Sequence, residues 1–190
     1  MASFSRRVPD GDNRERAVCN DCGFVAYENP KVVVGSVVVA GDKVLMCRRA
    51  IEPRRGFWTL PAGYMELGET LEEAAQREAL EEAEAAITLD GVLGLFSIAR
   101  IGQVQVIFRA RFADADQPRF AAGPESLDVA LFAWDQIPWE EIAFPSVVWA
   151  LEAWKAHGEG RLTAPAMNPS ADLRGMKGLA TLARREENGL

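Results

Sequence analysis

The sequence predicts an α/β domain with a cluster of carboxylates on one of its helices. Apolar, β-branched stretches recur on both sides of a segment rich in helix-forming residues, which is typical of mixed α/β folds. That glutamate-rich segment, Gly63 to Ala85 (GYMELGETLEEAAQREALEEAEA), starts with a glycine turn and continues in good helix formers. Nearly half of the 190 residues are apolar, which is enough for one well-buried domain with arms.

We predict that the first half of the domain forms a β-hairpin followed by a loop. Residues 32–40 are almost wholly apolar and β-branched, so we predict a buried strand. Gly41-Asp42 is a turn, and residues 43–49 alternate as a second strand. Residues 51–56 form a loop, and a short strand, 57–61, leads into Gly63, where the backbone can approach a ligand closely.

The second half alternates in the same way. We predict strands over residues 87–99, 103–112 and 129–134. Ser146 can cap a helix that ends near Gly158 and carries apolar residues on one face, namely Val147, Leu151 and Trp154. The second half therefore adds three strands and a second helix to the fold.

Composition changes at both ends of this domain. We expect an N-terminal arm over residues 1–30, the main folded domain over 31–158, and a partly helical tail over 159–190. In the tail, apolar residues recur every three positions, which favours one amphipathic helix: Leu173, Met176, Leu179 and Leu182. The tail could pack on the domain, cover a partner subunit or fray.

The net charge of −7 excludes some functions. Binding of nucleic acid without sequence preference requires a basic surface, so an acidic chain that handles phosphates needs cations. No apolar run approaches the about 18 residues of a membrane span, and the N-terminus lacks an apolar signal core. We expect no membrane or nucleic-acid partner and a cytoplasmic location.

The carboxylates of the glutamate-rich segment share a helix face. Glu78 lies beside both Glu81 and Glu82, because helix positions three and four apart are neighbours. Such a face is either a solvated surface or a site for a hard cation, since Mg²⁺ and Mn²⁺ prefer carboxylate oxygens. The residues of this face alone leave both interpretations open.

The spacing of the segment resembles the Nudix hydrolase signature, G-x5-E-x7-R-E-U-x-E-E-x-G-U, where U is apolar. The matching positions are Gly63, Glu69, Arg77-Glu78 and Glu81-Glu82. Glu84 stands where the family has glycine, and we expect that change to affect the helix end rather than the chemistry. The small residues Ala79 and Ala85 occupy apolar positions.

Further stretches resemble the Nudix subgroup of plant-type FAD and ADP-ribose pyrophosphatases. They are residues 29–35, 60–64, 123–127 and 137–138. Residues 16–23, with Cys19 and Cys22, resemble the second knuckle of the zinc ribbon that precedes the domain in that subgroup, while the first knuckle is missing. One CxxC supplies two of the four ligands of a structural zinc. Three interpretations are open: a zinc site completed within one chain, a zinc shared by two subunits, which would fit a homodimer, or a vestige without metal.

The resemblance implies an α/β/α sandwich around a mixed sheet. It also implies hydrolysis of a nucleoside diphosphate derivative, ADP-ribose or FAD, to AMP and a phosphorylated product with two or more Mg²⁺ or Mn²⁺ ions. The implied metal ligands are Glu78, Glu81, Glu82, the Gly63 carbonyl and a glutamate from a later loop, Glu125, with Asp128 as the alternative. The implied catalytic residues are Glu78, Glu82 and Glu125, of which Glu82 or Glu125 accepts the proton from water.

Other residues near the segment have supporting roles. Arg77 is expected to pair with Glu69 and fix the loop. Candidates for substrate binding are two cations and two aromatic residues, Arg49, Arg54, Trp58 and Tyr64; surface and core roles are equally open for them. Two other functions are considered: a nucleotide sensor without catalysis, and a pyrophosphatase for NADH or another dinucleotide. The intact glutamates argue against the sensor, and the lack of an SQPWPFP-like stretch argues against NADH.

Overall fold

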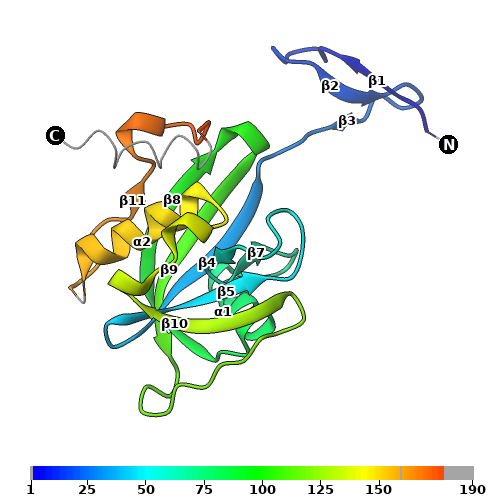
Figure 1. Ribbon diagram of the computed structural model, residues 1–190. Coiled ribbons are helices and arrows are strands. Elements are labelled where there is room, and N and C mark those ends of the chain that lie inside the picture. The colour runs from blue at the N-terminus through cyan, green and yellow to red at the C-terminus, as the bar shows by residue number, and fades with distance from the viewer. Residues whose placement is uncertain (1, 159, 178–190) are drawn as a thin grey trace. The chain divides into compact units, whose positions relative to one another are not determined.

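In a computed structural model, which describes residues 2–158 and 160–177, the chain divides into an N-terminal unit, residues 1–30, and a second unit, residues 31–190 (Figure 1). Each unit has its own sheet. The N-terminal unit is an antiparallel sheet of three short strands, β1 (Phe4–Arg7), β2 (Arg16–Cys19) and β3 (Val25–Ala26). The sequence had indicated an arm here but no sheet.

The cysteine pair lies at the turn between β2 and β3. The Gly23 N–H donates to the Cys19 carbonyl (3.0 Å), and the Cys19 N–H donates to the Phe24 carbonyl (2.8 Å). Cys19 is buried and Cys22 is exposed, and both are free thiols. Hydrogen bonds from the backbone N–H groups of Cys22 and Asp21 lower the pKa of the Cys19 thiol. The turn therefore already favours a thiolate at Cys19.

The second unit is built on an eight-stranded mixed sheet. Its main path runs β10-β5-β4-β9-β8-β11, with β6 paired to β5 and β7 paired to β4. The β4–β9 and β8–β11 pairs are parallel, and the others are antiparallel. The strands are β4 (Lys31–Ala40), β5 (Lys43–Arg49), β6 (Trp58–Thr59), β7 (Ala62–Tyr64), β8 (Ile87–Ile98), β9 (Gln103–Phe112), β10 (Ser126–Ala133) and β11 (Ala166–Met167).

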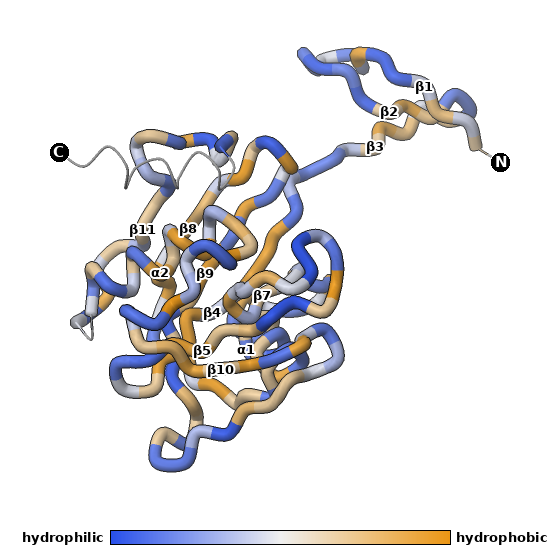
Figure 2. Tube along the Cα trace, in the orientation of Figure 1, coloured by the Kyte–Doolittle hydropathy of each residue, from blue (hydrophilic) through white to orange (hydrophobic). Residues whose placement is uncertain are grey.

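Two helices cover opposite faces of this sheet, as expected for an α/β/α sandwich. Alternate residues of a strand point to opposite faces. Val37 of β4 packs with α2 (Pro145–His157), whereas Val34 and Val38 pack with α1 (Leu71–Ala83). The strands at the centre of this unit are largely hydrophobic and the connecting loops largely hydrophilic (Figure 2). Burial of the sheet on both faces explains why the sequence of β4 is a continuous apolar run.

The two helices α1 and α2 begin in different ways, one with a side-chain cap and one without. Thr70 caps α1 in a capping box, in which its side chain accepts from the Glu73 N–H (3.2 Å) and the Glu73 carboxylate accepts from the Thr70 N–H (2.8 Å). The sequence prediction that Ser146 caps α2 is wrong. Phe144 is the N-cap and Pro145 opens the helix, because its fixed φ suits the first turn and its missing N–H is not needed there. Ser146 is buried inside the first turn.

The end of α1 shows how the chain turns at Glu84, where the signature has a glycine. Glu84 is the C-cap in a left-handed conformation (φ 47°, ψ 28°), and the next N–H, of Ala85, reaches back to the Ala79 carbonyl (3.1 Å). The turn therefore forms without glycine, at the steric cost that a side chain brings to this region.

We expect Glu84→Gly to stabilise the protein by about 0.5–1 kcal/mol, because removal of the strain outweighs the extra freedom of the unfolded chain. Urea unfolding would show a higher midpoint with unchanged slope. Glu72→Gly, at an exposed position inside the same helix, is the control and should lower the midpoint by a similar amount. A lower midpoint for Glu84→Gly would contradict the argument.

The C-terminal segment departs from the sequence prediction. Residues 160–177 contain β11 and a 3-10 turn (Ser170–Asp172) rather than an amphipathic helix. Leu173 and Met176 are exposed, and Leu179 and Leu182 lie outside the described residues. Further 3-10 turns are Ala99–Ile101, Trp134–Gln136 and Trp139–Glu141.

Among the helices that the structure describes, none combines the length and the apolar character required to cross a membrane.

Candidate active site

Helix α1 places two glutamates on its buried face. Glu78 and Glu82, one turn apart, are 7% and 5% exposed and lie among the alanines that pack on the sheet. The side chain of Glu81 is 57% exposed. Of the three carboxylates that share this helix face in sequence, two are thus buried and one reaches solvent.

Arg77 ties these acids to the preceding loop. Its Nε donates to Glu69 (2.5 Å), and its Nη1 donates to both Glu78 (2.7 Å) and Glu81 (2.9 Å). Its Nη2 also donates to the Tyr64 carbonyl (3.0 Å). The Arg77 guanidinium holds the pKa of Glu69 below its usual range. Arg77 therefore fixes the loop between Gly63 and α1, which we call the glycine loop, to the helix and offsets part of the acidic charge.

Gly63 lies directly over Glu78. A Cβ built on Gly63 would collide with the Glu78 carboxylate. Gly63 belongs to β7, which pairs with Val34 of β4, so the loop cannot move away cheaply. Glycine at this position lets the backbone of the loop and a buried carboxylate occupy adjacent space.

Glu82 is a carboxylate in an apolar setting. Its Oε2 accepts from the Ala62 N–H (2.9 Å). Burial, reinforced by the charges of Glu78 and Glu125, raises the pKa of Glu82 to about 7, although the Ala62 N–H and Arg49 oppose the shift. Burial likewise raises the pKa of Glu78, against the influence of Arg77. The site holds more negative charge than its own cations balance.

The loop before β10 brings Glu125 to these acids. The N–H groups of Ala121 and Gly123 donate to the carbonyls of Ala83 (2.9 Å) and Glu82 (3.1 Å) at the end of α1. The Glu125 carbonyl accepts from the Ala50 N–H (2.7 Å). The loop thus satisfies carbonyls that the last turn of a helix leaves free, and its own position is fixed by them.

Substitution of Gly123 tests this arrangement. A Cβ at Gly123 would collide with the backbone carbonyl oxygen of Glu81, so the loop must shift and take Glu125 with it. We expect Gly123→Ala to lower kcat/KM about 10- to 100-fold, because small misplacements of catalytic groups are costly. It should also destabilise the protein by about 1–3 kcal/mol. The exposed neighbour Ala122→Ser should change neither quantity; wild-type kinetics in Gly123→Ala would refute the positioning role.

These groups open into a cavity of about 810 Å³, a size typical of small-molecule sites. Most residues proposed from sequence line it: Arg49, Gly63, Tyr64, Arg77, Glu78, Glu81, Glu82 and Glu125. Arg49 is buried, and its Nε donates to the Pro53 carbonyl (2.9 Å). The Tyr64 hydroxyl accepts from Gln103 (3.0 Å). The cavity therefore combines polar and cationic groups with an acidic wall, which is formed by Glu78, Glu81, Glu82 and Glu125.

Three sequence candidates lie elsewhere. Trp58 is 7% exposed and packs edge-on against Phe132 (4.9 Å between ring centroids), so it is a core residue rather than a ligand contact. The Arg54 guanidinium stacks on Phe57 (3.7 Å) in an exposed loop outside the cavity lining. Asp128, the alternative to Glu125, lies on β10 and does not line the cavity. We remove these three residues from the site.

The structure also adds residues that the sequence did not indicate. They come from the β8–β9 connection, the start of β9, the start of α2 and the C-terminal segment, and they are Arg100, Gln103, Gln105, Phe144, Trp149 and Lys177. None belongs to a recognisable motif. The start of α2 could have been suspected because an aromatic residue and proline precede a buried helix. Nothing in the sequence placed residues 174–175 against the end of β8.

The acidic wall fits a divalent cation by its chemistry. Within residues 2–158 and 160–177, no three His, Cys, Asp or Glu side chains already form a metal site. Glu78 instead accepts from Arg77, and Glu82 accepts from the Ala62 N–H. The buried carboxylates Glu78 and Glu82 nevertheless offer hard oxygen ligands and have raised pKa values. A cation beside them would offset this excess charge.

Comparisons with known proteins agree with this geometry. Residues 29–150 match the family model described as NUDIX domain, and residues 2–28 match a zinc-ribbon model described as Nudix N-terminal. The crystal structure of a NUDIX hydrolase from Nitrosomonas europaea is similar, with a TM-score of 0.80 and 40% identity, covering 87% of this chain and 94% of that one.

Two curated relatives indicate the range of the family. An ADP-ribose pyrophosphatase from Methanocaldococcus jannaschii is 30% identical over 113 residues, 59% of this chain and 67% of its own. An NAD-capped RNA hydrolase, NudC, from Haemophilus influenzae is 38% identical over 74 residues, 36% of this chain but only 27% of its own length. Nudix enzymes generally use divalent metal ions. With a matching domain over most of its length and a fold shared with a solved member, the chain belongs to the Nudix hydrolase family.

Proposed function

We propose that this chain hydrolyses the pyrophosphate bond of a nucleoside diphosphate derivative with the help of Mg²⁺ or Mn²⁺, and that ADP-ribose is its leading substrate. One observation carries the proposal. Glu78, Glu82 and Glu125 border a cavity large enough for a nucleotide, and they carry more negative charge than their protein partners balance.

The acids of this wall would hold the metal ions. Glu78, Glu82 and Glu125 are the first ligands, with the exposed Glu81 and the Gly63 carbonyl completing the set. Bound divalent ions offset the charge of the pyrophosphate and lower the pKa of a coordinated water.

The chain's own groups then control the proton and the geometry. Glu82 or Glu125 accepts the proton of the attacking water. Oε2 of Glu82 is already held by the Ala62 N–H, which leaves Oε1 for this role. Water oxygen bonds to one phosphorus, the bridging P–O bond breaks, and the electron pair leaves with the other phosphate. For ADP-ribose the products are AMP and ribose phosphate.

The substrate choice is drawn from the relatives. The archaeal relative named ADP-ribose pyrophosphatase favours ADP-ribose. FAD is included because several stretches resemble the plant-type FAD and ADP-ribose pyrophosphatases. A dinucleotide such as NADH is the alternative, supported by the relative named NAD-capped RNA hydrolase.

The deciding experiment measures release of the nucleotide product, which is AMP for ADP-ribose, FAD and NADH and adenosine 3′,5′-bisphosphate for CoA. ADP-ribose, FAD, NADH, CoA, diadenosine polyphosphates and nucleoside triphosphates are incubated with Mg²⁺ and then with Mn²⁺. We expect ADP-ribose to give the highest kcat/KM and EDTA to abolish turnover. Tight binding of a nucleotide without any cleavage would favour the second candidate, a nucleotide sensor.

The N-terminal unit bears on assembly. We propose a homodimer in which Cys19 and Cys22 of two subunits share a zinc ion. Light scattering together with zinc analysis tests the idea, because Cys19→Ser with Cys22→Ser should release the metal and yield monomers. A wild-type monomer free of zinc would make the knuckle a vestige.

A further inference from the structure

We propose that the C-terminal strap, residues 160–177, forms part of the substrate cavity and supplies an anion subsite, in which Lys177 and Arg100 bind a phosphate that the substrate carries in addition to its pyrophosphate. The proposal rests on the proposed function, since it concerns the same cavity. Neither residue belongs to the signature from which the function was inferred.

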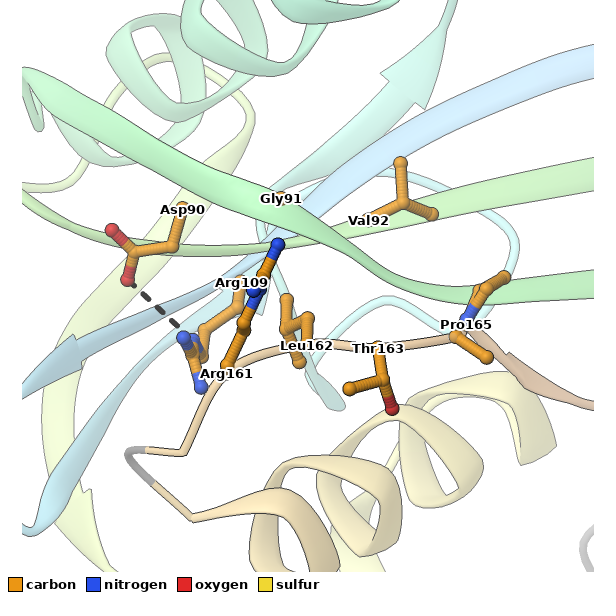
Figure 3. Close-up of a pocket in the computed structure, with 9 residues that line it drawn as sticks. Asp90, Gly91, Val92, Arg109, Arg161, Leu162, Thr163 and Pro165 are labelled. Carbon is orange, nitrogen blue, oxygen red and sulfur yellow. Dashed lines mark ion pairs between the residues drawn. The ribbon is translucent and has the colours of Figure 1, made fainter.

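The strap is anchored where it begins. Arg109 of β9 donates from Nη1 to the carbonyls of Gly158 (2.9 Å) and Gly160 (2.8 Å). Its Nε lies 3.5 Å from Asp90 of β8. Figure 3 shows this pair beside Arg161, Leu162, Thr163 and Pro165, which border a small cavity of about 280 Å³ together with it. A buried arginine thus ties the end of α2 and the start of the strap to the sheet.

The strap is anchored again beside the main cavity. Asn168 pairs with the backbone of Ser97, accepting from its N–H (2.7 Å) and donating to its carbonyl (2.9 Å). The Ala99 N–H donates to the Arg174 carbonyl (2.9 Å). The backbone at Gly175 lies so close that a Cβ there would collide with the Ser97 carbonyl. Residues 174–177 are therefore seated against the end of β8.

Asp172 fixes the position of Lys177. Asp172 is 7% exposed, and its two carboxylate oxygens accept from the N–H groups of Met176 (2.8 Å) and Lys177 (2.9 Å). The backbone of Lys177 is thus set by a buried acid, while the residue itself is exposed and lines the cavity. A charged side chain on a fixed backbone loses less entropy when it binds a ligand.

The cavity has a charge gradient. Its acidic lining residues come from the glycine loop, α1 and the loops around Glu52 and Glu125, where Arg49 and Arg77 also lie. Arg100 and Lys177 line the part formed by the end of β8 and the strap, and no acid of those two segments lines the cavity. Among residues 2–158 and 160–177, no carboxylate forms an ion pair with either cation.

Two cations that have no acidic partner among the described residues, and that come from other segments than the proposed metal ligands, suit a phosphate group. The metal ions would neutralise the scissile pyrophosphate at the acidic wall, so the cations at the strap remain available for a second anion. A phosphate on the nucleoside ribose, at either the 2′ or the 3′ position, has this chemistry. The subsite would therefore select among nucleoside diphosphate derivatives by their ribose phosphates.

Two pairs of compounds that differ by one phosphate test the proposal. NADPH differs from NADH by a 2′-phosphate, and CoA differs from dephospho-CoA by a 3′-phosphate. Calorimetry in EDTA measures their affinities without turnover. We expect the phosphorylated member of one pair to bind about tenfold more tightly, in line with a charge-assisted hydrogen bond, and that pair identifies the position.

The variants assign the preference to the strap. Lys177→Gln and Arg100→Gln should each reduce the affinity ratio several-fold, and Lys177→Arg should keep most of it. Arg174→Gln is the matched control, because it removes the same charge from the same strap at a side chain that does not line the cavity. Equal affinities within both pairs, no binding of any compound, or a ratio unchanged by Lys177→Gln would overturn the subsite.

The proposed anion subsite and the proposed hydrolysis can each be refuted without the other. Hydrolysis of nucleoside diphosphate derivatives without any phosphate preference would refute the subsite alone. A preference in binding that depends on Lys177, in a protein that cleaves none of the compounds, would refute the proposed hydrolysis and leave the subsite standing.

Discussion

Glu82→Gln should reduce kcat for ADP-ribose by about 10³-fold with Mg²⁺, while the protein remains folded. The substitution removes a charge from the wall that would hold the metal ions and removes one of the two groups that could accept a proton from water. General acid–base groups alone contribute about 10²- to 10⁴-fold to turnover, so loss of both roles gives an effect of this size.

The fold should survive because the replacement keeps the local hydrogen bond. The side-chain oxygen of glutamine can still accept from the Ala62 N–H, as Oε2 of Glu82 does now at 2.9 Å. Glu82 is 5% exposed, so a neutral group at this position is less costly to bury than a carboxylate. The metal-free variant should therefore be at least as stable as the wild type at pH 8.

The measurement combines initial rates of AMP release with thermal unfolding. Glu72→Gln, an exposed glutamate of the same helix, is the matched control and should keep wild-type values in both assays. Near-normal turnover of Glu82→Gln would mean that the proposed metal wall is wrong. Lost turnover together with lost stability would instead make Glu82 a structural residue.

The strands could be predicted from sequence because their signals are local. The runs predicted at residues 43–49 and 103–112 coincide with β5 and β9. The α/β/α layering followed from the family resemblance and is confirmed by the packing of α1 and α2 on opposite faces. The first turn of α2 was misread because serine is a common cap, whereas the proline before it can open a helix without any side-chain cap.

The acidic wall was accessible from sequence, but the rest of the cavity was not. Glu78 and Glu82 share a face by helix geometry, which periodicity reveals. Trp58 follows an arginine loop and resembled a base-stacking residue, yet it is buried in the core, and sequence does not show which face of a two-residue strand points inward. The segment that carries Lys177 is held by long-range contacts, among them those of Asn168, Arg109 and the Ala99 N–H, which leave no periodic signal.

In the absence of divalent metal, the free energy of unfolding should fall as the pH rises from about 5 to about 7.5. The folded protein raises the pKa of Glu82 to about 7 from an ordinary value of 4.5, chiefly by burial. Between these values the folded state binds more protons than the unfolded state, so stability decreases with pH. The size is on the order of 3 kcal/mol, and the raised pKa of Glu78 acts in the same direction.

The other carboxylates whose pKa values are shifted do not mask this decrease of stability with pH. The pKa values of Glu69 and Asp12 are lowered, so these groups lose their protons in both states below the window. Thermal unfolding in EDTA should therefore show a melting temperature about 6–10 °C lower at pH 7.5 than at pH 5. Glu82→Gln should remove most of the slope, and Glu72→Gln should keep it.

Mg²⁺ should restore stability mainly at the upper end of this range. A cation and a proton compete for the same carboxylate, so the gain from Mg²⁺ grows as Glu82 loses its proton. A melting temperature that rises equally with Mg²⁺ at pH 5 and pH 7.5 would place the metal away from Glu82. A metal-free slope that persists in Glu82→Gln would show that other groups titrate, and the excess charge at the acidic wall would then need another explanation.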